Sequence, residues 1–190
     1  MGQDKGLMLF DDKPMIVFLL EKLKDQLDEV ILVLRNKKQC QEYQKILRSS
    51  SSKYDLDLKF FSDEIKSQGP LSGIFTGLSH VDSDYSLVIP CDSPFISPQF
   101  IDKIFKKLRD NLGKYDAIVP FWGENPRENL EPLHAIYNKK TKKIIHSQLL
   151  EGKRDVKSFI NKLNTLFVNV DELDPSLKSF KNFNQPEDFK

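Results

Sequence analysis

Apolar runs of strand length alternate with helical patterns along most of the chain. The run EVILVL, from Glu29 to Leu34, is rich in β-branched residues and predicts a buried strand. Before it, residues 14–27 carry apolar side chains at helical spacing, and Pro14 suits a first helical position. After it, residues 37–52 predict a helix that runs out into a serine linker. The chain therefore begins with a helix, a strand and a second helix.

The same alternation continues to the end of the chain. Further strands are predicted over residues 56–61, 85–90, 115–122, 133–137 and 165–170, and further helices over residues 69–80, 97–112, 139–150 and 155–163. Ser97 is of the residue type that caps a helix N-terminus, and it precedes a proline. Strands this apolar, alternating with helices, predict an α/β fold in which helices cover both faces of a mostly parallel sheet. We expect one domain over residues 1–190.

Composition and charge exclude several classes of protein. Apolar residues make up 39% and charged residues 30% of the chain, as in ordinary globular proteins, and the net charge of +1 gives no general attraction to nucleic acid. Cys40 and Cys91 lie far apart and lack metal-ligand spacing, which indicates a reducing compartment. No apolar run approaches the ~18 residues that a membrane span needs. We expect a cytoplasmic protein that binds neither nucleic acid nor membrane.

Ligands of open α/β sheets bind outside the carboxyl ends of the strands, so the segments that directly follow strands hold the candidate residues. Three segments qualify: residues 62–73, 91–97 and 121–132. The first contains Asp63 and a loop with Gly69 and Gly73, whose glycines would let the backbone approach a ligand. A plain connection between strand and helix is the alternative interpretation of this loop.

Asp92 follows the strand predicted over residues 85–90 and lies in a turn between Pro90 and Pro94. A single carboxylate at a rigid sheet edge suits Mg²⁺, which is typically held by one or two carboxylates plus substrate phosphates. The alternative is that Asp92 caps the helix that begins near Ser97, although it lies early for a cap. The carboxylate should disfavour the neighbouring Cys91 thiolate, so we interpret Cys91 as a packing residue and not as a nucleophile.

The opening MGQDKGLMLFDDKPMI and the later stretches GPLSG, PCDSPFI, EPLHAIY and NFNQPEDF, taken in order, resemble one family, the molybdenum cofactor guanylyltransferases. The opening MGQDKGLMLFDDKPMI is similar to the second half of that family's nucleotide-binding segment, L-A-G-G-x-S-x-R-M-G-x-D-K-x-L followed by a turn and G-K-P. The resemblance continues through GPLSG, PCDSPFI, EPLHAIY and the closing NFNQPEDF, and so spans nearly the whole chain. It implies a Rossmann-like nucleotidyltransferase fold.

The resemblance also implies an activity, a cofactor and partners. The activity is transfer of GMP from GTP to molybdopterin, which yields the guanine dinucleotide form of the cofactor and pyrophosphate. Mg²⁺ would be the metal, and acceptor molybdoenzymes or their chaperones would be further partners. The reaction is an attack by a phosphate on the α-phosphorus of GTP, and it needs positioning and charge neutralisation more than a covalent nucleophile.

Roles follow from the resemblance residue by residue. Lys5 would contact the nucleotide phosphates, and Asp92 would hold Mg²⁺. Asp63 would contribute to the GTP site, and the loop from Gly69 to Gly73 would shape the pocket. The segments that hold His134, Asn182 and Asn184 lie toward the pterin in the family. For His134 the alternative is a packed strand residue, and for Arg154, which could meet a pterin phosphate, it is solvated surface.

The sequence departs from the family pattern in two places. The family's first strand and its glycine-rich loop precede the Met-Gly pair, whereas this sequence starts at that Met, so we expect a shortened form of a longer protein. Loss of that strand should leave neighbouring strands with unpaired edges and an apolar slot. The family's base-contacting asparagine often follows the strand directly, but here Val33 and Leu34 come first and Asn36 later.

Two alternative functions remain open at this stage. One is a related nucleotidyltransferase that uses another nucleoside triphosphate or another acceptor, such as a sugar phosphate or a phosphorylated alcohol. The other is a catalytically silent regulatory module that kept the fold and lost the glycine-rich loop. Substitution of Asp92 by alanine separates an enzyme from a silent module, because only an enzyme has Mg²⁺-dependent turnover to lose.

Overall fold

The computed structural model describes residues 4–10, 12–48, 56–65 and 69–181. Its strands are β1 (Leu9–Phe10), β2 (Lys13–Pro14), β3 (Glu29–Leu34), β4 (Asp57–Ser62), β5 (Tyr85–Leu87), β6 (Ala117–Trp122), β7 (Asn129–Leu130), β8 (Ile136–Asn138) and β9 (Thr165–Asn169). Its α-helices are α1 (Met15–Leu23), α2 (Lys37–Arg48), α3 (Pro70–His80), α4 (Pro98–Asp110), α5 (Lys142–Leu150), α6 (Val156–Ile160) and α7 (Val170–Leu173). Short 3-10 helices cover Lys5–Leu7, Lys139–Thr141 and Lys178–Phe180.

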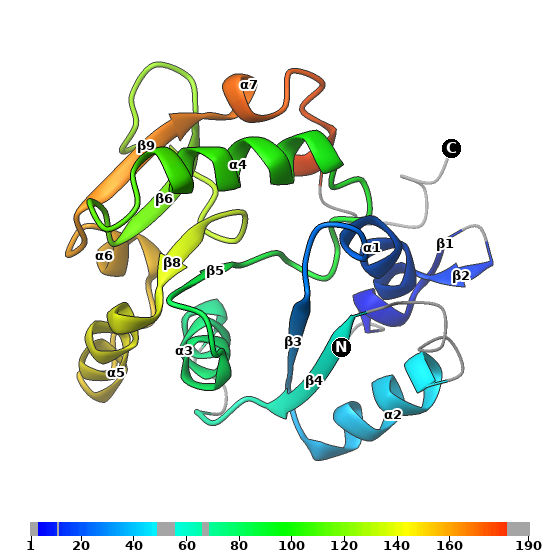
Figure 1. Ribbon diagram of the computed structural model, residues 1–190. Coiled ribbons are helices and arrows are strands. Elements are labelled where there is room, and N and C mark those ends of the chain that lie inside the picture. The colour runs from blue at the N-terminus through cyan, green and yellow to red at the C-terminus, as the bar shows by residue number, and fades with distance from the viewer. Residues whose placement is uncertain (1–3, 11, 49–55, 66–68, 182–190) are drawn as a thin grey trace.

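The strands form three separate sheets in the described part of the chain (Figure 1). β1 and β2 make a small antiparallel hairpin, and β3 pairs with β4 in parallel over all six residues of each strand. The largest sheet has the order β5-β8-β6-β7, and β9 pairs in parallel with β6. β8 runs antiparallel to both of its neighbours, β5 and β6. β5 and β6 therefore run in the same direction.

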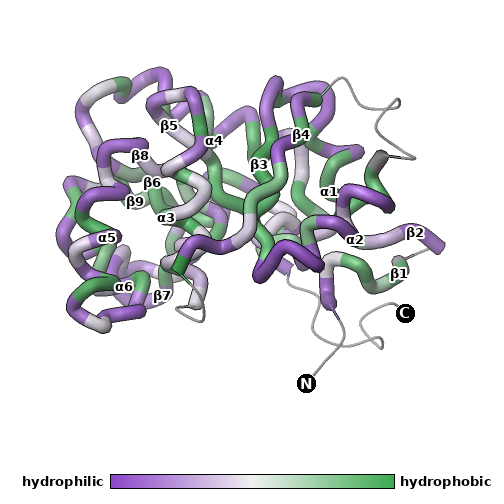
Figure 2. Tube along the Cα trace, turned by 90° about the horizontal axis from the view of Figure 1, so that it is seen from below, coloured by the Kyte–Doolittle hydropathy of each residue, from purple (hydrophilic) through white to green (hydrophobic). Residues whose placement is uncertain are grey.

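Helices cover both faces of the large sheet, as the alternation of buried side chains in β6 shows. Ile118 packs into a cluster with α1, α4 and α7, whereas its neighbours Ala117 and Val119 pack into a second cluster with α3, α5 and α6. Successive residues of a strand point to opposite faces, so a strand apolar at every position is buried on both. Figure 2 shows the hydrophobic segments gathered in the interior of the trace and the hydrophilic ones mostly in outer loops and turns.

Local signals of the sequence explain where several helices begin. Ser97 accepts a hydrogen bond from the Phe100 backbone N–H at 3.0 Å and caps α4, as the sequence predicted. Helix α1 ends at Leu23, four residues before the end that the pattern predicted, because Lys24 to Gln26 form a turn. No helix within the described ranges is both long and apolar enough to cross a membrane.

Two predicted strands are shorter than expected. The strand predicted over residues 85–90 forms ladder pairs only from Tyr85 to Leu87, and beyond it the Val88 N–H donates to the Ala135 carbonyl at 2.9 Å. The strand predicted over residues 133–137 starts only at Ile136, because Leu133 and His134 lie in a turn. The small elements β1, β2, β7 and α7 were not predicted, because two to four residues are too few to show a periodic spacing of apolar side chains.

The α/β fold class agrees with the sequence prediction. β3 and β5 do not pair with each other, and within the described residues each has a single strand partner, β4 and β8 respectively. Between them lies a cavity of about 1390 Å³.

Candidate functional site

Lys5 and Asp92 meet although 87 residues separate them in the sequence. The Lys5 ammonium Nζ lies 3.0 Å from Asp92 Oδ2, an ion-pair and hydrogen-bond distance. The Lys5 side chain is 43% exposed and the Asp92 side chain 17%, so the pair lies at the surface but is partly shielded. A cation and a carboxylate thus stand together beyond the end of β5, at the edge of the sheet where the sequence analysis placed the site.

The backbone around Lys5 is held by helix α2. Asp4 caps the short helix Lys5–Leu7 and accepts the Gly6 N–H at 3.1 Å. The buried Tyr43 hydroxyl donates to Asp4 Oδ1 at 2.9 Å, and the Gln39 amide donates to Asp4 Oδ2 at 2.5 Å. A β-carbon on Gly6 would lie 2.2 Å from the Tyr43 hydroxyl, so only glycine fits here. Asp4 therefore ties the Lys5 segment to α2.

The turn that carries Asp92 rests on buried residues below it. Ser93 is fully buried, its N–H donates to the Pro90 carbonyl at 3.3 Å, and its hydroxyl lies 3.1 Å from His134 Nε2. Since Ser97 caps α4, the alternative that Asp92 is the cap does not apply. Asp92 does not cap α4, and its carboxylate forms the ion pair with Lys5.

His134 is a packed core residue, although it lies in a turn and not in the strand that the alternative supposed. Its side chain is 1% exposed, and its ring packs edge-on against Phe100 and Phe180. Nδ1 lies 3.4 Å from Glu131 Oε2. In this structure the imidazole presents no surface to a ligand, and its contact with Ser93 supports the Asp92 turn from below.

Asp63 contributes its carboxylate to the turn between β4 and α3. Its Oδ2 accepts the Ser72 hydroxyl at 2.6 Å, and its Oδ1 accepts the Thr76 hydroxyl at 3.3 Å and the Ile65 N–H at 3.2 Å. These bonds fix the start of α3 relative to the sheet. The role of Asp63 in a GTP site stays a prediction, and in this structure the carboxylate stabilises the loop.

Gly69 and Gly73 leave open space beside α3. Gly69 precedes Pro70, the first residue of the helix, with φ +71°, a conformation that glycine adopts at little cost. A β-carbon on either glycine would meet nothing within 4 Å. Gly73 lines the cavity between β3 and β5, and Lys5 lines the same cavity. Gly73 and Lys5 thus face one space, and its role as a nucleotide pocket stays a prediction.

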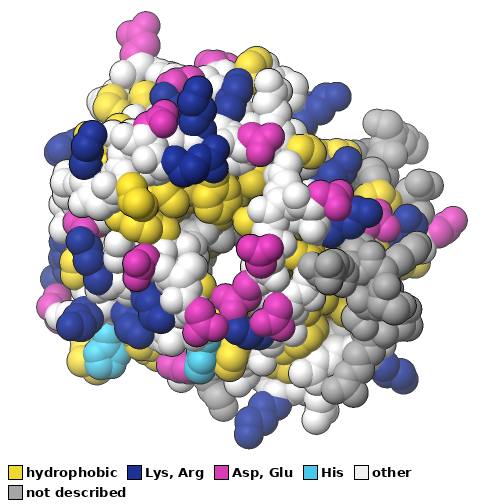
Figure 3. Space-filling view, in the orientation of Figure 1, with side chains coloured by type: hydrophobic (Ala, Val, Ile, Leu, Met, Phe, Trp, Pro, Cys, Tyr) yellow, Lys and Arg dark blue, Asp and Glu magenta, His cyan; other side chains and the backbone are white. Residues whose placement is uncertain are grey.

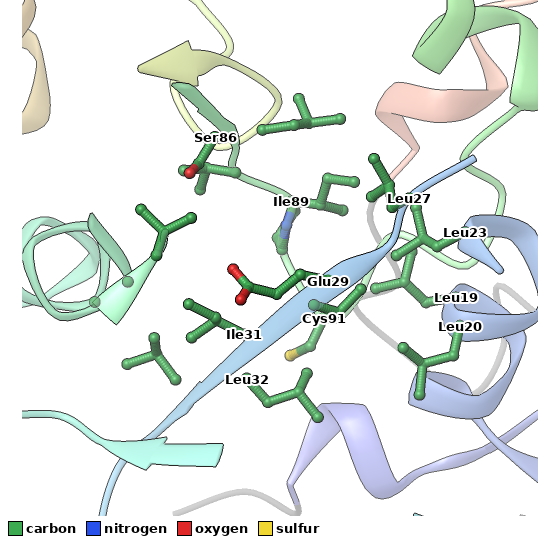
Figure 4. Close-up of a pocket in the computed structure, with 18 of the residues that line it drawn as sticks. Leu19, Leu20, Leu23, Leu27, Glu29, Ile31, Leu32, Ser86, Ile89 and Cys91 are labelled. Carbon is green, nitrogen blue, oxygen red and sulfur yellow. The ribbon is translucent and has the colours of Figure 1, made fainter. Parts of the chain in front are cut away.

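The cavity changes character along its length. Its middle is lined by leucine, isoleucine and valine side chains from α1, β3 and the segment after β5 (Figure 4). Asp4, Lys5, Arg35 and Cys91 line it too, and these residues belong to the carboxyl edge of the strands. That edge offers charged groups of both signs next to Asp92.

Electrostatics at this edge disfavour a thiolate. Partial desolvation and the nearby carboxylates Asp92 and Asp4 raise the pKa of the Cys91 thiol to about 11. Burial and the Asp4 carboxylate also raise the pKa of the Tyr43 hydroxyl well above its usual value, so it stays a donor. Cys91 is therefore protonated at neutral pH, which disfavours a nucleophilic role. Its interpretation as a packing residue is wrong, because Cys91 is exposed.

The remaining predicted residues are less informative. Asn182 and Asn184 lie outside the described residues. Arg154 is exposed and lines a smaller pocket of about 340 Å³ together with Pro70 and Lys157. Asn36 accepts the Gln39 N–H at 3.0 Å at the start of α2, which is the contact of a helix cap.

The residues that hold the Lys5 segment were missed by the sequence analysis. Asp4, Gln39 and Tyr43 come from two segments more than 30 residues apart, and nothing in their local pattern links them. The only available signal was the glycine on each side of Asp4 and Lys5, which marks a tightly packed backbone.

Among the described residues no group of three or more His, Cys, Asp or Glu side chains could enclose a metal ion. The Asp92 carboxylate is partly exposed, at the end of a strand and beside a cation. Such a lone carboxylate fits Mg²⁺, which takes its other ligands from phosphates and water. The residues present therefore fit a metal that arrives with a nucleotide.

The chain is similar to proteins of known family. The MobA-like NTP transferase domain matches residues 1–166. Two curated proteins, each named as a probable molybdenum cofactor guanylyltransferase, are similar over nearly the whole chain. The protein from Methanothermobacter thermautotrophicus is 37% identical, and the alignment covers 100% of this chain and 91% of that protein. The protein from Methanosarcina mazei is 34% identical, and the alignment covers 98% of this chain and 81% of that protein.

Solved structures agree with this match. The molybdopterin-guanine dinucleotide biosynthesis protein A of Archaeoglobus fulgidus superposes with a TM-score of 0.77 at 26% identity, covering 99% of this chain and 88% of that one. A cytidylyltransferase of Leptospira borgpetersenii, at 13% identity and a TM-score of 0.64 over 90% of this chain and 71% of that one, shares the fold alone. The chain belongs to the MobA-like NTP transferase domain family and is a nucleotidyltransferase.

Proposed function

We propose that this nucleotidyltransferase transfers GMP from GTP to molybdopterin and releases pyrophosphate. The relatives named as molybdenum cofactor guanylyltransferases support the choice of substrates. The observation that carries the proposal is the meeting of Lys5 and Asp92 at 3.0 Å beyond a strand end, since phosphoryl chemistry needs a cation and a metal-binding carboxylate together.

In the proposed reaction an oxygen of the molybdopterin phosphate attacks the α-phosphorus of GTP. A new bond forms between that oxygen and the α-phosphorus, and the bond to the oxygen that bridges the α- and β-phosphates breaks. Pyrophosphate leaves with the electron pair of the broken bond. No residue of the chain becomes covalently attached, so the chain contributes position and charge.

The chain's own residues divide this task. Lys5 neutralises phosphate oxygens, and Asp4, through Gln39 and Tyr43, keeps the Lys5 backbone in place. Asp92 would hold Mg²⁺, and the chemistry that the ion supplies is neutralisation of phosphate charge. The α3 start at Gly69 leaves room for a ligand.

The test is pyrophosphate release measured with each of the four nucleoside triphosphates, with and without molybdopterin, and with and without Mg²⁺. We expect release only with GTP, molybdopterin and Mg²⁺ together. Asp92→Asn, which keeps the side-chain size, should lower turnover by at least about 100-fold while the circular dichroism spectrum stays unchanged.

Asp116→Asn is the matched control, because Asp116 also pairs with a lysine, Lys140 at 2.9 Å, but lies away from the site. It should leave turnover unchanged. Equal release with another nucleotide or another acceptor would favour a related nucleotidyltransferase. Turnover that survives Asp92→Asn would contradict the assignment of Asp92, and a folded protein that binds no nucleotide would favour the silent module.

A further inference from the structure

Two polar side chains lie in the interior directly below the Asp92 turn. Charged side chains at a surface need no special explanation, and Figure 3 shows them with both signs over one face of the molecule. Ser93 and His134 differ, because they are 0% and 1% exposed and neither takes part in the proposed transfer. Burial of polar groups costs free energy unless they are hydrogen-bonded, so their contacts show what they hold in place.

Ser93 and His134 belong to a chain of polar contacts that starts at Trp122, the last residue of β6. The Trp122 Nε1–H donates to Glu131 Oε1 at 2.6 Å, and Glu131 Oε2 lies 3.4 Å from His134 Nδ1. His134 Nε2 lies 3.1 Å from the Ser93 hydroxyl, and Ser93 follows Asp92 directly in the sequence. The chain of contacts therefore leads from the sheet to the residue next to the candidate metal ligand.

The charge on Glu131 sets the direction of the hydrogen bonds. Burial raises the pKa of the Glu131 carboxyl, but the contacts with His134 and Trp122 outweigh it and hold the pKa below its usual value, so the group is ionised at neutral pH. A carboxylate beside Nδ1 favours the proton on that nitrogen. Nε2 of the neutral ring is then the acceptor of the Ser93 O–H. The Nδ1 contact itself is not a well-formed hydrogen bond, so Glu131 acts mainly through its charge.

Aromatic rings and backbone bonds hold the imidazole in this position. The rings of Phe100 and Phe180 meet it edge-on, with centroids 6.3 and 5.3 Å away. The backbone N–H of Glu131 donates to the Pro120 carbonyl of β6 at 2.8 Å, and that of His134 donates to the Glu131 carbonyl at 3.1 Å. The ring cannot turn without displacing close-packed neighbours, so the Ser93 hydroxyl has an acceptor in a fixed place.

The Asp92 turn needs a restraint that does not depend on Lys5. In the structure the Lys5 ammonium pairs with the Asp92 carboxylate at 3.0 Å. In the proposed reaction Lys5 would turn to the nucleotide phosphates, and this pairing would be lost when Asp92 has to hold Mg²⁺. Ser93 provides a restraint of another kind. Its N–H donates to the Pro90 carbonyl at 3.3 Å, and its hydroxyl bonds to His134 whichever partner Lys5 has.

We propose that His134 is a positioning residue for the transfer: through the Ser93 hydroxyl it keeps the Asp92 turn in the conformation that binds Mg²⁺. Glu131 supports this role by favouring the proton on Nδ1. The role depends on the proposed function, because Asp92 is taken as the metal ligand. Residues 121–132, the third segment that follows a predicted strand, thereby contribute to the site through Trp122 and Glu131.

Three substitutions at His134 test its contact with Ser93. His134→Gln can keep the contact, because the glutamine amide reaches about as far as Nε2 and offers an oxygen acceptor. His134→Asn reaches only about as far as Nδ1, and His134→Leu offers no polar atom, so both lose the contact. Ser93→Ala removes the same contact from the other side and leaves the aromatic rings in place, so it serves if His134→Leu does not fold.

Thr141→Val is the matched control. Thr141 is also 1% exposed, and its hydroxyl donates to the Asn138 carbonyl at 2.8 Å. Asn138 is the last residue of β8 and pairs with Tyr85, the first residue of β5, so Thr141 lies at the opposite edge of the sheet from the Asp92 turn. Thr141→Val should lower Tm, as loss of a buried hydrogen bond does, and leave the Mg²⁺ dependence unchanged.

The first readout is the Mg²⁺ concentration that gives half-maximal turnover with GTP and molybdopterin. His134→Asn, His134→Leu and Ser93→Ala should raise it by about 10–100-fold, and His134→Gln should stay close to the unchanged chain. Turnover at saturating Mg²⁺ should fall much less, because excess ion recovers the molecules in which the turn has moved. A variant that is only partly folded would instead lower turnover at every Mg²⁺ concentration.

The second readout needs no ligand. It is amide hydrogen exchange of Ser93 and Ile96, whose N–H groups donate to the Pro90 and Ser93 carbonyls within the turn. Exchange should be severalfold faster in His134→Leu and His134→Asn, because the turn has lost its buried anchor. It should be unchanged in His134→Gln and in Thr141→Val.

The outcomes separate this role from the proposed function. Unchanged Mg²⁺ dependence in His134→Asn and His134→Leu, with turnover still lost in Asp92→Asn, would overturn the role of His134 and leave the proposed function standing. Equal effects of His134→Gln and His134→Leu would mean that the imidazole serves packing alone, which also overturns it. Turnover that survives Asp92→Asn would overturn the proposed function and the positioning role together.

Discussion

Alanine at Gly6 tests whether the Lys5 segment is held against α2 as closely as the structure shows. The added β-carbon would lie 2.2 Å from the Tyr43 hydroxyl oxygen, and the next atoms are Tyr43 Cζ at 3.3 Å and the Cys91 β-carbon at 3.5 Å. Nonbonded carbon atoms prefer about 3.5–4.0 Å, so one group must move. Tyr43 is 1% exposed, so its ring has no free space.

The expected cost follows from what has to move. Overpacking of a close-packed site costs about 1–3 kcal/mol. Displacement of the Tyr43 hydroxyl also weakens its 2.9 Å hydrogen bond to the Asp4 carboxylate, and a hydrogen bond to a charged group is worth about 1.5–3 kcal/mol. The two effects overlap, so we expect Gly6→Ala to lower the free energy of unfolding by about 2–4 kcal/mol in total.

A second substitution isolates the clash. Tyr43→Phe removes the hydroxyl and should cost about 1.5 kcal/mol for the lost hydrogen bond. In the Tyr43→Phe background the atom nearest to the new β-carbon is the ring carbon at 3.3 Å, so Gly6→Ala should cost little more. The double variant should therefore lie within about 0.5 kcal/mol of Tyr43→Phe, a coupling of about 2 kcal/mol that contacting residues can show.

The assay is urea unfolding of the four proteins, with comparison of midpoints at constant m-value. In thermal unfolding Gly6→Ala should lower Tm by roughly 5–10 °C, given about 2–4 °C per kcal/mol for a chain of this size. If the two substitutions add to within about 0.5 kcal/mol, the close approach of Gly6 to Tyr43 is not real and the role of Asp4 as the tie to α2 loses its support.

Three further predictions follow from the same coordinates. Gly73→Ala should raise the free energy of unfolding by about 0.5–1 kcal/mol, because a helical alanine meets nothing there, and should weaken GTP binding by calorimetry if the nucleotide lies along α3. Cys91, with its pKa of about 11, should react with iodoacetamide at pH 8 about 100-fold more slowly than a thiol of pKa 9, and Asp92→Asn should speed the reaction. Burial raises the pKa of the Asp174 carboxyl, but hydrogen bonds from Ser176 and Ser179 outweigh it and lower the pKa. The stabilisation from ionised Asp174 is therefore complete above the unfolded pKa of about 3.9 and is lost as pH falls through the lower folded value, so acid unfolding should be less steep in Asp174→Asn.

Local signals of the sequence were sufficient for the elements that carry them. β3 has the predicted bounds because the five apolar residues after Glu29 include β-branched side chains that favour a strand. Ser97 caps α4 because its hydroxyl accepts the Phe100 N–H in the first turn. β5 became shorter because its length depends on a neighbouring strand that the local pattern does not describe. The hairpin of β1 and β2 has two residues in each strand, which is too few to show an alternation of apolar and polar residues.

The site was predictable only where a motif carried it. The resemblance indicated that Lys5 and Asp92 belong together, and the structure brings them to 3.0 Å, but periodicity could not join residues 87 positions apart. The place of Asp63 after a strand predicts a ligand contact, and this stays a prediction. The local pattern did not show that its oxygens also accept hydrogen bonds from Ser72 and Thr76.

The ion pair of Lys5 and Asp92 explains how the site could hold its charges before a nucleotide arrives. Asp92 has only 17% of its side chain exposed, and a carboxylate in that position gains from a nearby cation. A nucleotide that brings phosphates and a divalent cation offers each side chain a new partner of the right sign. In the proposed reaction Lys5 would exchange a carboxylate for a phosphate, and Asp92 would exchange an ammonium for a metal ion. Neither side chain needs to carry an unpaired charge, with or without the ligand. The site can therefore be ordered before its ligand binds, and its rearrangement on binding costs little free energy.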